Sequence, residues 1–217
     1  MFDHIKNHRF ANVLDAMSEA IEPWDQTIAE SNSFVAIPTK GSIVPGWVLI
    51  LPRRHVISMR TLTERERCEY QEFSRIIIQR ISHEFSAPTV FEHGAGYPGS
   101  NMGCGVDHAH MHFVPLEFDL VDMVRRNESF GINWKAFETI QQFYSSVPPD
   151  RDYMTIAAPD GRLIGASGFV PVSQYLRRVI ALNVGDSSQW DYRLNSFEGN
   201  VLETLSRLKV SGPNQIN

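Results

Sequence analysis

Three histidines alternate with apolar residues in the run His108-Ala109-His110-Met111-His112. Successive side chains of a β-strand point to opposite faces, so residues two apart share one face and lie about 6.6 Å from one another. The run therefore predicts a strand with a row of three imidazoles on one face and apolar side chains on the other. A single histidine is usually structural, whereas three in strict alternation after a glycine-containing loop indicate a functional site.

The segments around this run predict a small antiparallel sheet. Thr63-Glu64-Arg65-Glu66 matches a capping box and begins a helix that we expect to run to about residue 85. Strands are expected over residues 34–37, 47–51, 89–93 and 108–116. The order strand, strand, helix, strand, strand with short connections favours an α+β fold, an antiparallel sheet with packed helices.

The remaining residues predict an α/β extension of this core. Pro159-Asp160-Gly161-Arg162 lies between two strand-like segments and indicates a hairpin. Apolar spacing predicts helices over residues 10–21, 134–144, 173–183 and 197–209. We expect residues 1–217 to form a single domain, in which 25–118 are the catalytic core and 119–217 are a C-terminal extension packed on it.

Composition excludes several classes of protein. The formal net charge of -5 argues against broad nucleic-acid binding, which depends on many Lys and Arg residues. Cys68 and Cys104 are too few for a disulfide framework, which favours a reducing compartment. The first residues contain no signal-like apolar run, and no stretch approaches the roughly 20 apolar residues needed to cross a bilayer. We therefore expect a cytoplasmic protein with neither nucleic acid nor membrane as partner.

The histidine run, extended by Phe113-Val114, resembles the His-apolar-His-apolar-His-apolar-apolar signature of the histidine-triad (HIT) family. Upstream, Gly103-Cys104-Gly105 occupies the position of the family's glycine-containing loop, with Cys104 and Gly105 in place of the usual polar pair. Asn101 is a polar residue that could take over their contact with the phosphate or leaving group.

An earlier segment extends the resemblance, which covers roughly residues 28 to 117. Residues 43–55 are similar to the family's hairpin pattern Pro-Gly-His-x-Leu-x-x-Pro-x-x-His, with Trp47 in place of the first histidine. His55 matches the family's fourth, supporting histidine, although it could also be an ordinary histidine at a strand end. Thr39 is the nearest counterpart of the residue that commonly holds the ribose.

The resemblance implies nucleotide chemistry on the histidine row. His110 would attack the α-phosphate to form a covalent nucleotidyl-histidine, and His112 would donate a hydrogen bond to the bridging or phosphoryl oxygen. The main-chain carbonyl of His108 would hold the tautomer of His110, and His55 would support His108. In the family a third histidine usually accompanies hydrolases, so His112 favours hydrolysis of a dinucleoside polyphosphate or nucleoside monophosphate conjugate over nucleotidyl transfer or phosphorolysis. The covalent step needs no cofactor, although a divalent metal ion can accompany a polyphosphate substrate.

Two arginines in the extension are further candidates for substrate binding. Arg177 and Arg178 lie near the start of the helix expected over 173–183, where free amides and arginines would suit the distal phosphates of a long substrate. The alternative is a solvated helix face whose apolar residues pack on the sheet.

Two other classes of function stay open. His-x-His on a strand also occurs in zinc sites, so a metal-dependent hydrolase is possible, although the row spans about 13 Å and one ion cannot easily bind all three rings. A non-catalytic nucleotide-binding protein could retain the same motif. We also expect a homodimer, because one copy of the predicted sheet leaves edges exposed.

Overall fold

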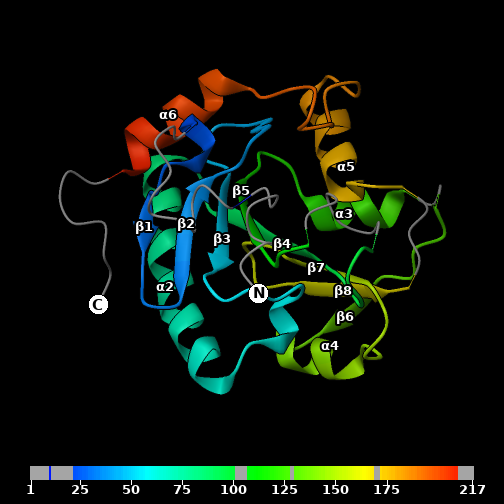
Figure 1. The fold of residues 1–217 in the computed structure, drawn as a ribbon. Helices are drawn as coiled ribbons and strands as arrows, with labels where there is room; N and C mark the ends of the chain where they lie inside the picture. The colour runs from blue at the N-terminus through cyan, green and yellow to red at the C-terminus, as the bar shows by residue number, and fades with distance from the viewer. Residues whose placement is uncertain (1–9, 11–21, 101–106, 128–129, 169–171, 210–217) are drawn as a thin grey trace.

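The computed structural model describes residues 10, 22–100, 107–127, 130–168 and 172–209. One eight-stranded antiparallel sheet runs through them in the order β1-β2-β3-β5-β4-β7-β8-β6 (Figure 1). The strands are β1 Ala29–Glu30, β2 Phe34–Pro38, β3 Val48–Pro52, β4 Pro88–Gly94, β5 Met111–Pro115, β6 Lys135–Phe137, β7 Tyr153–Ala157 and β8 Leu163–Ser167. The helices are α2 Glu64–Glu84, α3 Leu120–Arg126, α4 Ile140–Ser146, α5 Tyr175–Val184 and α6 Glu198–Leu208, with short 3-10 turns η1 Pro23–Asp25 and η2 Met59–Thr61.

The predicted α+β fold is confirmed, and the four expected core strands form the neighbouring strands β2, β3, β5 and β4. The histidine strand is shorter than expected, because β5 begins at Met111 and not at His108. The register that pairs Ile50 with Met111 would place Pro52 opposite Ala109. Proline has no amide hydrogen to donate, so the regular ladder stops there.

The capping box at the start of α2 is confirmed. The Thr63 side chain accepts from the Glu66 backbone amide, and the Glu66 carboxylate accepts from the backbone amide of Thr63. Phe73, Ile77 and Ile81 form the buried stripe of the helix. They belong to the same apolar cluster as Ala109, Met111 and Phe113, so α2 covers the face of the sheet opposite the imidazoles.

The C-terminal extension continues the same sheet. The expected hairpin is β7 and β8, and β7 pairs with the free edge of β4 through the register Val90↔Ala157 to Gly94↔Tyr153. The helix expected over 134–144 is wrong in its first half. Residues Lys135–Phe137 pair with β8 as the edge strand β6, and α4 begins only after Thr139, whose hydroxyl accepts from the Gln142 amide.

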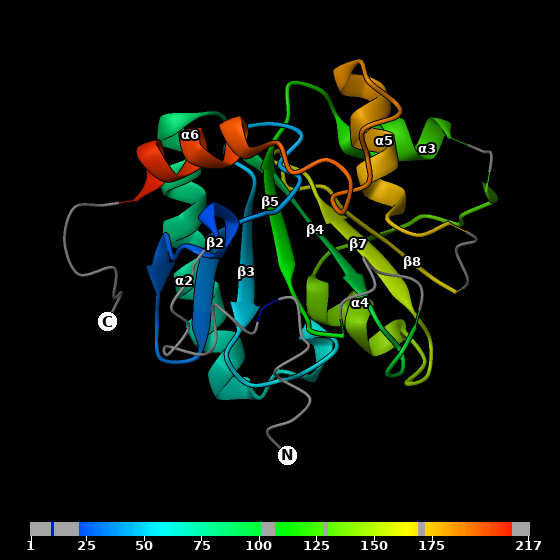
Figure 2. The same ribbon diagram turned by 45° about the horizontal axis from the view of Figure 1, so that its top comes forward.

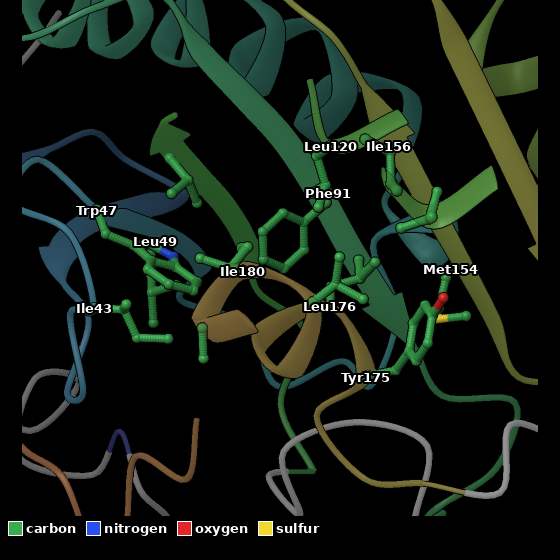
Figure 3. Packing of buried hydrophobic residues seen from close by; sticks show 14 of the residues in the cluster. Ile43, Trp47, Leu49, Phe91, Leu120, Met154, Ile156, Tyr175, Leu176 and Ile180 are labelled. Atoms are coloured by element: carbon green, nitrogen blue, oxygen red, sulfur yellow. The ribbon is translucent and has the colours of Figure 1, made fainter. Parts of the chain in front are cut away.

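The two faces of the sheet carry different helices. Helices α2 and α4 lie on one face, whereas α3 and α5 lie on the other, as the two views show together (Figures 1 and 2). Leu176 and Ile180 of α5 pack toward Phe91 on β4, with Trp47 and Leu49 close by (Figure 3). The extension therefore covers the face of the sheet that carries the histidine row.

Three expectations concern the ends and edges of the chain. The helix expected over residues 10–21 lies outside the described residues, apart from Phe10. No helix among the described residues is long and apolar enough to span a membrane. The homodimer stays a prediction, but the exposed edge of the core sheet no longer argues for it, because β7 of the same chain pairs with β4. The edges of the full sheet are instead the short outer strands β1 and β6.

Candidate active site

The three histidines of the row lie together on the face of the sheet covered by α5. Their exposed fractions are 2% for His108, 7% for His110 and 1% for His112. The ring centroids of His110 and His112 are 4.8 Å apart, and the ring of Phe10 packs edge-on against His108 and His110 at 5.8 and 5.5 Å. The row is therefore a buried cluster with an aromatic cap.

A backbone carbonyl fixes the tautomer of His110. Its Nδ1 lies 2.8 Å from the carbonyl oxygen of His108, and a carbonyl only accepts hydrogen bonds. Nδ1 therefore carries the proton, and the lone pair of the neutral ring is on Nε2. An imidazole nitrogen with a lone pair is a nucleophile near neutral pH.

The opposite tautomer is fixed in His112. The indole nitrogen of Trp47 is a donor only, and it lies 3.1 Å from Nδ1 of His112. Nδ1 therefore accepts, and the proton of the neutral ring is on Nε2. Burial, together with the charges of His110, His93 and Arg177, holds the pKa of His112 well below its ordinary value. His112 is thus a neutral donor, and its Nε2 has no hydrogen-bond partner within the part of the chain that the structure describes.

His108 is held from two sides. Its Nε2 donates to the carbonyl oxygen of Pro52 at 2.7 Å, and its ring lies 5.4 Å from the ring of His55. His55 is exposed and donates from Nε2 to the carbonyl oxygen of Asp107 at 2.6 Å. The structure thus brings the predicted supporting histidine next to the first histidine of the row.

Arg177 of the extension reaches the same cluster, although it lies 65 residues beyond His112. Its side chain is buried, its guanidinium carbon lies 4.6 Å from the centre of the Trp47 ring, and it donates to the carbonyl oxygens of Gly41 and Trp190. Its charge contributes to the low pKa of His112. A permanent positive charge therefore lies behind the residue that orients His112.

Comparison with known proteins agrees with this geometry. The model of the HIT domain family matches residues 22–119, which include the whole histidine row and the hairpin that carries Trp47 and His55. These residues form a HIT domain.

The relatives of this HIT domain are distant. The chain is 25% identical over 142 residues to galactose-1-phosphate uridylyltransferase of Hypocrea jecorina; the match covers 64% of this chain but spans only about a third (35%) of the length of that relative. A HIT family member from Bacillus subtilis matches with 20% identity and a TM-score of 0.43, over 64% of this chain and 94% of that one. A Hit-like protein from Bartonella henselae, described as involved in cell-cycle regulation, matches with 15% identity and a TM-score of 0.40, over 51% and 80% of the two chains.

The resemblance to the HIT family also predicts substrate contacts by the glycine-containing loop and by Thr39. Asn101, Gly103, Cys104 and Gly105 lie outside the described residues. Thr39 is buried; its hydroxyl donates to the carbonyl oxygen of Lys40, and its amide donates to that of Trp47. Thr39 therefore lies beside the backbone of the residue that orients His112.

Arg178 lies away from the histidine row. Its guanidinium carbon lies 3.3 Å from the centre of the Trp190 ring, and its Nε donates to the carbonyl oxygen of Ser173. Arg177 and Arg178 are adjacent in sequence, but only Arg177 packs on Trp47. The structure thus separates the two arginines that the helix pattern groups together.

His93 is a histidine of the cluster that sequence reasoning missed. An isolated histidine in a sequence is usually a structural or surface residue, but His93 is buried on β4, and its ring lies 6.3 Å from that of His112. The strand expected over 89–93 already indicates that Phe91 and His93 share one face of the sheet, because they are two residues apart. Only the pairing of Phe91 with His112 shows that this is the face of the histidine row.

The row does not form a metal-binding cluster. Within the described ranges, no three His, Cys, Asp or Glu side chains lie where they could hold one metal ion. The rings of His110 and His108 use Nδ1 and Nε2, respectively, to donate to backbone carbonyls. The metal-dependent alternative therefore gains no support from the arrangement of these side chains.

Proposed function

We propose that the protein is a nucleotide hydrolase that acts at the α-phosphate of a dinucleoside polyphosphate or a nucleoside monophosphate conjugate. The observation that carries the proposal is the bond from His110 Nδ1 to the carbonyl oxygen of His108 at 2.8 Å. It leaves the lone pair of His110 on Nε2, which is the atom that would attack phosphorus.

The reaction proceeds in two displacements. In the first, the Nε2 lone pair of His110 forms a bond to the α-phosphorus, and the bond from phosphorus to the leaving group breaks. The ring of His110 becomes positively charged, and the carbonyl oxygen of His108 stabilises the Nδ1 proton that it already accepts. In the second, water attacks phosphorus and loses a proton to solvent, the bond to Nε2 breaks with its electron pair returning to Nε2, and a nucleoside monophosphate is released. Two displacements in series replace one difficult step.

The neighbouring groups stabilise charge that develops on the phosphoryl oxygens. His112 donates from Nε2, and its low pKa keeps the ring neutral, so that it acts as a hydrogen-bond donor and not as a cation. Arg177 supplies a fixed positive charge behind Trp47. Preorganised donors and charges stabilise the charge of a transition state more strongly in a buried site than in water. No cofactor takes part in the covalent step, although a divalent metal ion can accompany a polyphosphate substrate.

Transfer to a second acceptor is the alternative within the same chemistry. The uridylyltransferase relative supports it, because its name describes transfer of a nucleotidyl group to a sugar phosphate. In that case the first displacement is unchanged, and the acceptor replaces water in the second. His112 favours hydrolysis, since the resemblance associates a third histidine with hydrolases.

The two reactions are separated by a substrate screen with product identification. Purified protein is incubated with nucleoside polyphosphates, nucleoside phosphoramidates and nucleotide sugars, each with and without a sugar phosphate. Hydrolysis gives a nucleoside monophosphate without any acceptor, whereas transfer gives a new nucleotide sugar and depends on the acceptor. A protein that binds these compounds tightly but forms neither product would be a non-catalytic nucleotide-binding protein.

The sequence pattern predicts that Arg177 and Arg178 bind the distal phosphates of a long substrate. On that prediction, Arg178→Ala reduces kcat/KM for a dinucleoside polyphosphate about tenfold, and far less for a nucleoside phosphoramidate that lacks these phosphates. Arg177→Ala also removes the buried charge behind Trp47, so it is expected to reduce kcat/KM for both substrates, with the larger loss on the dinucleoside polyphosphate if Arg177 binds the distal phosphates. Thermal unfolding of both variants controls for the loss of packing, since Arg177 is buried. Equal effects on both substrates would return the two arginines to a structural role.

The protein is also predicted to be a homodimer. Because β7 fills the β4 edge, association would use another surface, such as the margins at β1 and β6. Sedimentation at micromolar concentration is expected to give twice the mass of one chain. A single-chain mass under these conditions would contradict the dimer and show that the extension is enough to cover the sheet of the core without a second copy.

A further inference from the structure

His93 lies beside the histidine row with unused hydrogen-bonding capacity. Phe91 is paired with His112 across β4 and β5, and the two rings stack with centroids 4.4 Å apart. His93, two residues further along β4, turns its ring perpendicular to both, at 5.7 Å from Phe91 and 6.3 Å from His112. It is 8% exposed, and neither ring nitrogen has a partner within the described part of the chain.

Two more unpartnered groups lie around His93. Nε2 of His112 and the hydroxyl of Tyr175 are also buried without a hydrogen-bond partner among the described residues. Tyr175 lies beside Met154 (Figure 3), and Met154 is directly opposite His93 in the pairing of β4 with β7. Buried polar groups are normally satisfied, so three unsatisfied groups in one neighbourhood indicate a ligand that supplies their partners.

The ionisation state of His93 limits the chemistry of this ligand. Burial, and then the charges of His110 and Arg177, lowers the pKa of His93 to about 3. The ring is therefore neutral near pH 7 and offers one N–H donor and one lone pair. A phosphate oxygen only accepts and would leave the lone pair facing an anion, whereas an alcohol hydroxyl can both donate and accept.

We propose that His93, His112 and Tyr175 form a subsite for a sugar hydroxyl next to the phosphate that reacts with His110. The hydroxyl lies a few bonds from the phosphorus, because the His93 and His112 rings are only 6.3 Å apart. His112 donates to the phosphate, Tyr175 and His93 hold the hydroxyl, and the charge of Arg177 favours the phosphate over a neutral group. This inference rests on the proposed function, and it adds that the sugar attached to the reacting phosphate is recognised through a hydroxyl.

The test compares hydroxyl removal from the substrate with removal of the imidazole. Wild-type protein, His93→Phe and His93→Gln are assayed with a nucleotide substrate and its 2′-deoxy and 3′-deoxy analogues. For one analogue, the wild type is expected to lose about tenfold in kcat/KM, the value of one lost hydrogen bond with its unpaired partner. His93→Phe is expected to lose a similar factor in kcat/KM on the parent substrate and to show no further loss on that analogue. His93→Gln keeps a donor and an acceptor, so it is expected to recover part of the kcat/KM that His93→Phe loses.

The controls separate folding and catalysis from recognition. His83→Phe changes an exposed histidine on α2, with 83% of its side chain exposed, and is expected to behave as wild type on all substrates. Equal losses for His93→Phe on the parent and on every deoxy analogue would overturn the subsite. Calorimetric binding of a nucleoside monophosphate and its deoxy forms needs no turnover, so it tests the subsite independently of catalysis. If the wild type forms no covalent intermediate, the proposed function is overturned, but the binding measurement still tests the subsite.

Discussion

His110→Ala is expected to lose turnover by about 10⁴-fold or more, because it removes the atom that forms the covalent intermediate. The imidazole of His110 is a small part of the buried cluster, and the other two rings keep their own partners in Pro52 and Trp47. We therefore expect folding and nucleotide binding to be largely retained. Rapid-quench kinetics and calorimetric binding measure the two effects separately.

A direct observation of the intermediate makes this prediction sharper. Mass spectrometry of acid-sensitive adducts in the wild type is expected to show one added nucleotidyl group, which is absent in His110→Ala. His83→Ala, on the exposed surface of α2, is the matched control and should retain both adduct and turnover. Wild-type turnover in His110→Ala would exclude the covalent mechanism.

Trp47→Phe is expected to lower kcat about 10- to 100-fold with little change in KM, the range seen when a residue that orients a functional group is removed. Phenylalanine keeps an aromatic ring next to Arg177 and Phe91 but lacks the N–H that holds Nδ1 of His112. His112 can then carry its proton on Nδ1, so that Nε2 no longer donates to the substrate. The ¹⁵N chemical shifts of the His112 ring report this change of tautomer directly.

Trp24→Phe is the matched control for this variant. Trp24 is a partly buried tryptophan that lies beneath Lys40 and packs against the apolar cluster on the face of the sheet opposite the imidazoles. Trp47→His restores a side chain that can donate and is expected to recover part of the activity. An unchanged ¹⁵N spectrum with unchanged kcat in Trp47→Phe would show that the indole does not position His112.

The local patterns of this chain were sufficient to predict most of its elements. The capping box at Thr63, the hairpin turn at residues 159–162 and the helices expected over 173–183 and 197–209 all appear in the structure. The helix expected over 134–144 failed where Lys135–Phe137 instead pairs with β8. Over three residues, apolar spacing is compatible with both a helix and a strand. The pairing with β8, a segment nearly thirty residues later in the sequence, decides for the strand.

The sequence by itself determined the histidine row, because alternation of side chains is a local property of an extended backbone and needs no knowledge of the rest of the fold. Only the tertiary structure decided what surrounds the row. The bond from Trp47 to His112 joins residues 65 positions apart, and the bond from Arg177 to Gly41 joins residues 136 apart. Such contacts depend on strand register and on the docking of α5 over the sheet, which no local pattern encodes. For the same reason His93, an isolated histidine in the sequence, is recognised as part of the site only once β4 lies beside β5.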